Sequence, residues 1–307
     1  MPLSYFPFLL CLLCGLSSDG VSAMKSPNVT VDGMNRFVRI NALPVTVDLD
    51  APITVGQLVR FSGRFNLDFS HFSIYLTQNH GQGNEYMPFH MNIHNHGTAV
   101  LNTMQDGVWG TETHFQHYYT SGQKFAIHIR CQQYKFEIYL NHIMMYEISH
   151  QLPLDRIKQI SMFGDATMDS VEWGGGPIHT PFLNTYGPMI EGRVVVTGVA
   201  TDDFELGFVD VNAEKPFYLN ARFSQSKVVA NSLKYLVWER EETASVSFPF
   251  QKGEMFEITI LNVPGELVVE HNGLPLITFK HRSDDPRGAY TTIYVGELHE
   301  LWNVVWN

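Results

Sequence analysis

The sequence predicts an all-β protein built from two tandem antiparallel β-sandwich domains. Three observations predict this fold class. Patterns typical of helices are nearly absent, apolar and polar residues alternate with period two in most segments, and the second half of the chain repeats residue spacings of the first half.

The alternation is clear in two segments that lie far apart in the chain. In residues 135–140, Phe136, Ile138 and Leu140 fall on one face of an extended strand. Residues 256–260 place three apolar residues in the same way, with polar residues between them. Many short strands of this kind, joined by turns, favour a sandwich in which each strand buries one face.

A glycine- and proline-rich segment interrupts the pattern near the middle of the chain. Gly174 to Pro181 holds three glycines and two prolines, which suit neither a helix nor a central strand. We therefore expect a first domain over residues 24–174, a linker over 175–181 and a second domain over 182–307.

The two halves share the spacing of their polar and aromatic residues. In each half an asparagine precedes a tryptophan by seven positions, and a glutamate follows the tryptophan by three. These residues are Asn102, Trp109 and Glu112 in the first half, and Asn231, Trp238 and Glu241 in the second. The repetition indicates one fold made twice.

The N-terminus has the pattern of a signal peptide. Residues 6–16 are nearly all apolar, and Val21-Ser22-Ala23 is a small-residue cleavage pattern, so residues 1–23 predict export and an extracellular protein. The apolar stretch is shorter than the roughly 20 residues that a bilayer span needs. A cytoplasmic location would follow if this segment were not functional.

The charge of the chain argues against two classes of partner. The formal net charge is −11, and no run of lysine and arginine occurs. We therefore expect neither nucleic-acid binding nor insertion into a membrane. Outside the N-terminal segment, which holds Cys11 and Cys14, only Cys131 remains, and its alternation with Ile127 and Ile129 predicts a buried, inert thiol.

One predicted strand of the first half carries a row of polar residues that could bind a ligand. Four polar side chains share a face of this strand: His90, Asn92, His94 and His96. Asparagine and neutral histidine both donate and accept hydrogen bonds, as sugar hydroxyls do. Trp109 adds a flat apolar face on which the C–H face of a galactose ring can lie, and Glu112 adds an acceptor beside it.

The chain resembles the galectin family in these motifs, over about residues 36–307. Galectins show His-x-Asn-x-Arg, Val-x-Asn and Trp-Gly-x-Glu-x-Arg. The first half has His90-Met91-Asn92-Ile93-His94, Val100-Leu101-Asn102 and Trp109-Gly110-Thr111-Glu112-Thr113-His114. The second half has Tyr218-Leu219-Asn220-Ala221-Arg222, Val229-Ala230-Asn231 and Trp238-Glu239-Arg240-Glu241-Glu242-Thr243.

The resemblance implies two jelly-roll carbohydrate-recognition domains with defined ligand-binding residues. In the first domain these are His90, Asn92, His94, Asn102, Trp109, Glu112 and His114. In the second they are Asn220, Arg222, Asn231, Trp238 and Glu241. His94 and His114 stand where the family has arginine, and Tyr218 and Thr243 replace the leading histidine and the last arginine, so sugar preference is expected to differ.

The resemblance further implies a bivalent lectin for β-galactoside-containing glycans of glycoproteins or glycolipids, able to cross-link them, with no cofactor, no metal and no catalytic residue. Self-association stays open. One alternative is a galectin-fold module that recognises proteins and has lost sugar binding.

Two further alternatives come from single residue types. A glycosidase normally needs two carboxylates around the scissile bond, and near Trp109 only Glu112 and Asp106 are present. Zinc could be held by His90, His94 and His96, but only the first half of the chain has these histidines.

Overall fold

The computed structural model describes residues 35–80, 85–176, 178–283, 285–286 and 288–306. Over these residues the chain forms four antiparallel sheets, and the helical elements are two short 3-10 turns, Leu154–Arg156 and Phe223–Gln225. The predicted all-β class is therefore confirmed. No helix in the described part is long and apolar enough to cross a membrane, and the expected signal peptide lies outside the described residues.

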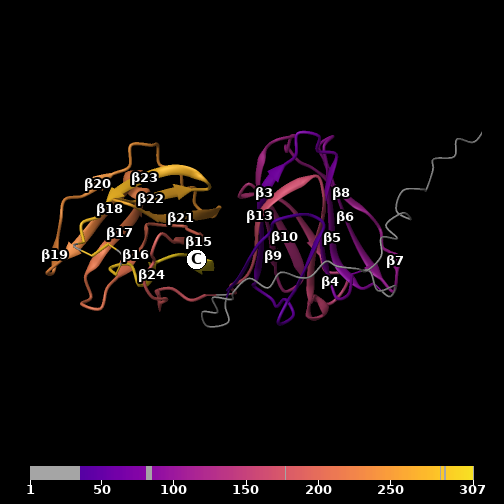
Figure 1. The fold of residues 1–307 in the computed structure, drawn as a ribbon, viewed down its shortest axis with the longest axis horizontal. Helices are drawn as coiled ribbons and strands as arrows, with labels where there is room; N and C mark the ends of the chain where they lie inside the picture. Colours follow the sequence, from indigo (N-terminus) through magenta and orange to yellow (C-terminus); the bar gives the residue numbers. More distant parts are fainter. Residues whose placement is uncertain (1–34, 81–84, 177, 284, 287, 307) are drawn as a thin grey trace, which may run out of the picture.

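The first domain is a sandwich of two sheets (Figure 1). One sheet, here called the first inner sheet, has the order β1 (Asn35–Arg39), β13 (Ala166–Gly174), β3 (Leu58–Phe65), β9 (Lys124–Cys131), β10 (Lys135–Leu140) and β11 (Ile143–Ser149). The other, the first outer sheet, has the order β2 (Val45–Asp48), β12 (Gln159–Gly164), β4 (His71–Thr77), β5 (Met87–His94), β6 (Thr98–Gln105) and β7 (Val108–Trp109), with β8 (Thr113–Gln116) also paired to β6.

The second domain repeats this arrangement. Its outer sheet has the order β14 (Phe182–Thr185), β24 (Thr292–Gly296), β16 (Phe204–Val209), β17 (Lys215–Arg222), β18 (Lys227–Lys234) and β19 (Val237–Trp238), with β20 (Glu242–Thr243) paired to β18. Its inner sheet has the order β23 (Leu274–Lys280), β22 (Glu266–His271), β21 (Met255–Val263), β15 (Arg193–Val199) and β25 (Glu300–Trp306). Each inner sheet lies on the side facing the other domain (Figure 1).

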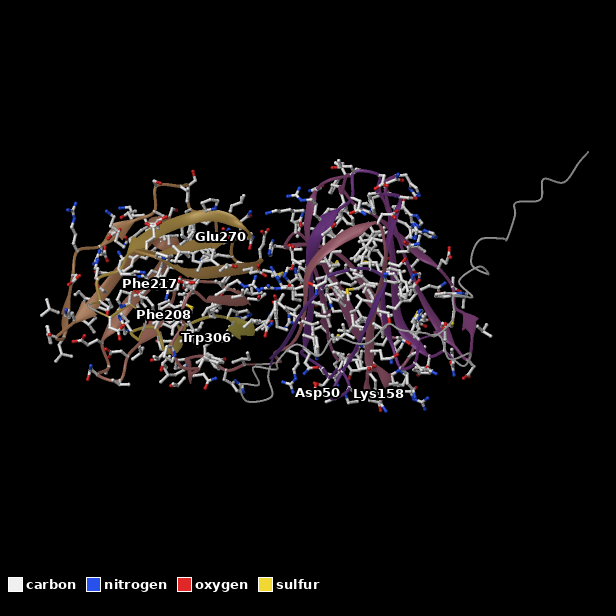
Figure 2. All side chains as sticks on the ribbon, viewed as in Figure 1. Asp50, Lys158, Phe208, Phe217, Glu270 and Trp306 are labelled. Atoms are coloured by element: carbon white, nitrogen blue, oxygen red, sulfur yellow. The ribbon has the colours of Figure 1, made fainter. Side chains whose placement is uncertain are left out.

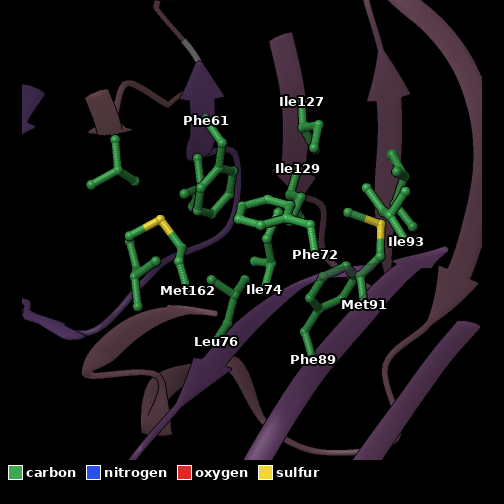
Figure 3. Close-up of a cluster of buried hydrophobic side chains, with 14 of the residues drawn as sticks. Phe61, Phe72, Ile74, Leu76, Phe89, Met91, Ile93, Ile127, Ile129 and Met162 are labelled. Carbon is green, nitrogen blue, oxygen red and sulfur yellow. The ribbon is translucent and has the colours of Figure 1, made fainter. Parts of the chain in front are cut away.

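Period-two alternation builds a separate core between the sheets of each domain. In the first domain, Phe61 and Ile129 of the inner sheet face Phe72 and Met91 of the outer sheet, and all four are fully buried (Figure 3). In the second domain, Phe208 and Phe217 of the outer sheet lie in an equivalent core (Figure 2), as do Phe256, Ile258 and Ile260 of the inner sheet. Cys131 lies in the first core, where burial raises the pKa of its thiol, as expected for an inert cysteine.

Polar side chains on the other face of the inner sheets join the two domains. Glu257 of β21 accepts hydrogen bonds from the guanidinium of Arg60 in β3, at 2.7 Å from Nε and 2.9 Å from Nη2. Glu172 of β13 accepts from Arg60 Nη1 at 3.3 Å and from Arg193 of β15 at 2.8 Å. Arg60 and both glutamates are buried, so each charge is paired out of contact with water.

Apolar contacts extend the same interface. Trp302 of β25 packs edge-on against Tyr139 of β10, and the guanidinium of Arg130 lies 3.9 Å from the centre of the indole ring. Arg130 also donates to Glu300 at 2.7 Å. The two domains therefore form four layers in the order outer, inner, inner, outer (Figure 1). The face of β10 that points away from the core of the first domain is covered by the second domain.

Candidate functional site

Strands β5, β6, β7 and β8 position six of the seven predicted residues of the first domain, and Glu112 lies between β7 and β8. In the register of β5 with β6, His90 lies opposite Asn102 and Asn92 lies opposite Val100, while Trp109 of β7 pairs with Met104. Because side chains alternate along a strand, the polar members point away from the core that buries Phe89 and Met91. The first outer sheet thus brings together the residues that the sequence selects.

His90 lies between two aromatic rings. It stacks on Tyr75 with ring centres 4.6 Å apart, and the ring of Trp109 is 5.0 Å away. Burial and, to a smaller degree, His94 lower the pKa of His90 to about 4, so the ring is neutral near pH 7. Within the described residues neither of its ring nitrogens has a hydrogen-bond partner. Both nitrogens are buried, so a sugar hydroxyl would have to displace neighbouring atoms to reach this unpaired donor and acceptor.

Imidazoles occupy the places where the family has arginine. His94 stacks on His96 at 5.0 Å, and its pKa is lowered by burial first and by His96, His71 and His117 after it. His114 lies 3.6 Å from Glu112, close enough to pair with it when protonated. The first site therefore offers shorter imidazole donors in place of a permanently charged guanidinium.

The segment around Trp109, here called the tryptophan corner, comprises Asn102, Trp109 and Gly110 and depends on tight backbone packing. Asn102 is buried, and its Oδ1 accepts the backbone N–H of Thr103 at 2.8 Å. A Cβ at Gly110 would lie 2.8 Å from Thr103 Oγ1 and 3.2 Å from Asn102 Oδ1, so only glycine fits without a shift. The ring of Trp109 remains 42% exposed beside this corner, as a stacking surface requires.

We expect sugar affinity at the first site to fall as the pH is lowered from 8 to 5. A bound ring would bury His94 further, which disfavours its charged form, so the complex would hold fewer protons than the free site. Titration calorimetry of lactose from pH 8 to 5 on a Trp238→Leu chain, in which the second site is weakened, measures this. Affinity that is flat or rises on acidification would contradict it.

The second domain has its predicted residues around a cavity of about 430 Å³. The lining residues are Tyr218, Asn220, Arg222, Val229, Asn231, Trp238, Glu239 and Glu241. All five residues predicted for this site are among them. The indole of Trp238 is 45% exposed, and the ring of Tyr218 lies 4.9 Å from it, as His90 lies beside Trp109.

A charged and hydrogen-bonded group holds one wall of this cavity. Arg222 Nη2 donates to Glu241 at 2.5 Å, and Arg222 Nε donates to Asn220 Oδ1 at 2.6 Å. Arg222 Nη1 donates to the other oxygen of Glu241 at 3.4 Å, so the guanidinium and the carboxylate form a two-point contact in the lining of the cavity. The equivalent pair in the first domain is His94 with Glu112, for which no direct hydrogen bond is seen among the described residues.

Three residues near the second cavity were missed by sequence reasoning. Glu205 accepts hydrogen bonds from the hydroxyls of Tyr218 and of Tyr294, the latter at 2.7 Å. Arg282 donates to Asn231 Oδ1 at 3.2 Å and to Glu242 at 2.6 Å. Glu205, Tyr294 and Arg282 come from strands or loops distant in sequence, and no local spacing ties them to the motifs. The tyrosine that replaces histidine is thus fixed by a carboxylate partner.

The structure brings different histidines together from those considered for zinc. Among the described residues, three side chains that could bind a metal lie together at the domain interface: His128, His142 and Glu257. Their candidate ligand atoms all lie within 4.8 Å of one another. Arg60 already occupies both oxygens of Glu257, and a divalent ion there would meet its positive charge. His90, His94 and His96 do not form such a group.

Comparison with known proteins agrees with the duplicated fold. The family model for galactoside-binding lectins matches residues 44–173 and again residues 182–306. A 32 kDa beta-galactoside-binding lectin of Caenorhabditis elegans is 31% identical over 208 residues, covering 66% of this chain and 74% of that protein. The protein of the same name in Haemonchus contortus is 28% identical, covering 76% and 82%. Galectin-4 of Sus scrofa is 23% identical, covering 83% and 93%.

Both matched regions coincide with a sandwich that carries the tryptophan corner, and members of this family are lectins, not enzymes. The chain therefore belongs to the galactoside-binding lectin family, as a member with two tandem galectin domains.

Proposed function

We propose that this protein binds β-galactoside-containing glycans at both outer sheets and cross-links the molecules that carry them. The observation that carries the proposal is the repeated placement of an exposed indole beside a hydrogen-bonding strand face. In the first site Trp109 lies beside His90, and in the second Trp238 lies beside Tyr218. Each pair combines an apolar stacking surface with donors and acceptors for hydroxyls.

The two sites are expected to differ in sugar preference. The second cavity keeps the arginine–glutamate pair, Arg222 with Glu241, whereas the first has His94 and His114 near Glu112. A glycan array probed with the full chain, and with Trp109→Leu and Trp238→Leu variants, separates the two preferences. A protein-recognition module would instead show no glycan binding above a Trp109→Leu/Trp238→Leu chain.

Cross-linking is tested by agglutination of galactoside-bearing cells. We expect the full chain to agglutinate them, and each single-site variant only to block agglutination by the full chain, since one site cannot bridge two cells. A Trp238→Leu chain that agglutinates as well as the unmodified protein would show that bridging comes from self-association.

We also propose that the protein is secreted, on the basis of the apolar segment 6–16 and the pattern Val21-Ser22-Ala23. Expression in a eukaryotic host tests this. Protein recovered from the medium should begin at Met24, and protein retained in the cytosol with an intact N-terminus would rule secretion out.

A further inference from the structure

An exposed apolar hairpin tip lies beside the second cavity. It is formed by Tyr235 and Leu236, which join β18 to β19, and by Val237, the first residue of β19; these residues are 79%, 89% and 65% exposed. Trp238, which lines the cavity, follows directly in sequence. In Figure 1, β19 lies at the end of the molecule remote from the first domain, so this tip projects away from the rest of the protein.

The conformation of the turn does not explain why tyrosine and leucine occupy its two tip positions. Tyr235 and Leu236 have φ angles of 50° and 62°, the left-handed conformation that asparagine, aspartate and glycine adopt most easily. The equivalent tip of the first domain has Asp106 and Gly107, at 52° and 78°. The second domain therefore holds two large apolar side chains where backbone preference and exposure to water both favour polar or small ones.

A second turn lies beside the tip. The tip and the turn between β16 and β17 line one hollow of about 550 Å³, in which Tyr235 and Leu236 lie next to charged side chains: Asp210, Glu214, Lys234, Glu239, Arg282 and Asp285. Val211, on that turn, is 95% exposed. The apolar side chains of both turns thus project at the same end of the outer sheet as the cavity.

We propose that the tip of this hairpin, Tyr235 to Val237, rests in the headgroup layer of a membrane when the second cavity holds the sugar of a short-headed neutral glycolipid. The inference rests on the proposed function. A galactoside held by a glycolipid lies close to an apolar surface, whereas one at the end of a long protein-linked glycan does not. An apolar patch continuous with a sugar cavity therefore fits a ligand with both features.

The composition of the tip agrees with an interfacial position. Tyrosine and tryptophan are the side chains enriched at the boundary between headgroups and acyl chains, and lysine can extend from there into water. Lys234 lies over the ring of Tyr235 at 5.6 Å, and Lys215 lies 5.6 Å from the ring of Trp238. The net charge of −11 makes a zwitterionic membrane the better partner than an anionic one. This contact is peripheral and involves no spanning segment.

The test compares a membrane-borne sugar with a soluble one. The variant Tyr235→Asp/Leu236→Gly gives the tip the residues of the first domain, which suit the same turn, so its melting temperature should not fall. The Trp109→Leu substitution is placed in both chains to isolate the second site. Flotation with phosphatidylcholine vesicles containing lactosylceramide measures membrane binding, and calorimetry with free lactose measures the sugar site.

We expect the tip variant to bind these vesicles at least tenfold more weakly while its affinity for lactose stays within twofold. Vesicles without the glycolipid should bind neither chain. Equal vesicle binding by both chains would overturn the proposal, as would a parallel loss of lactose affinity, which would assign the tip to the sugar site itself. A chain that dimerises through the tip in the absence of vesicles, and loses this in the variant, would also overturn it. Failure of the parent chain to bind lactose would instead count against the proposed function.

Discussion

Replacing Glu257 by alanine is expected to destabilise the docked arrangement of the two domains by about 3–5 kcal/mol, the range for removing one partner of a buried ion pair. The substitution leaves Arg60 buried with only the longer contact to Glu172, at 3.3 Å, and removes the 3.2 Å contact that His128 makes with the carboxylate. Urea unfolding of the full chain measures the loss, and small-angle scattering reports whether the domains separate.

Glu270→Ala is the matched control, because Glu270 lies on the neighbouring strand β22 and is only partly buried. We expect it to change stability by less than about 0.5 kcal/mol, as for ordinary surface substitutions. The double variant Arg60→Met/Glu257→Leu should recover most of the stability, since apolar residues of similar size often replace a buried pair without loss. Equal effects of Glu257→Ala and Glu270→Ala would show that the buried charges do not hold the domains together.

Trp238→Leu is expected to weaken galactoside binding at the second site by at least about tenfold, which corresponds to roughly 1.4 kcal/mol. The indole supplies a large flat apolar face in the lining of the cavity, and leucine cannot match its contact with a sugar ring. Calorimetry with lactose on the full chain, with Trp109→Leu in the background, isolates this site.

The folded state should tolerate this change, because the ring is 45% exposed and lies outside the core of the second domain. Tyr235→Ala, at an exposed residue of the adjacent tip, serves as the control and should leave lactose affinity unchanged. An unchanged affinity in a well-folded Trp238→Leu chain would remove the stacking role, and with it the main support for sugar binding at this sheet.

The sequence was sufficient to predict the fold and which residues share one face of a strand, since both depend on local spacing. Phe136, Ile138 and Leu140 share a buried face because a strand repeats every two residues. The predicted site residues gather for the same reason, on strands adjacent in sequence as well as in the sheet: His90 and Asn102 face each other across a short connection.

The same reasoning could not find residues whose partners are distant in sequence. Glu257 and His128 alternate with apolar residues and so read as solvated faces, because alternation does not distinguish a face covered by water from one covered by another domain. Glu205 and Arg282 were missed at the second site because each reaches it from a separate strand or loop. The turn at Tyr235 and Leu236 has none of the asparagine or glycine residues that would predict it, although both residues have left-handed φ angles.

The back-to-back packing of the inner sheets has a consequence for which glycans can be held at once. With the sugar-binding sheets on opposite ends of a four-layer stack (Figure 1), one molecule cannot reach two glycans on a single flat surface, so it gains no avidity there. The protein instead connects two facing surfaces across a fixed distance. Bridging should therefore depend sharply on the gap between them, and membranes held further apart than the length of the stack plus their glycans would not be joined at any protein concentration.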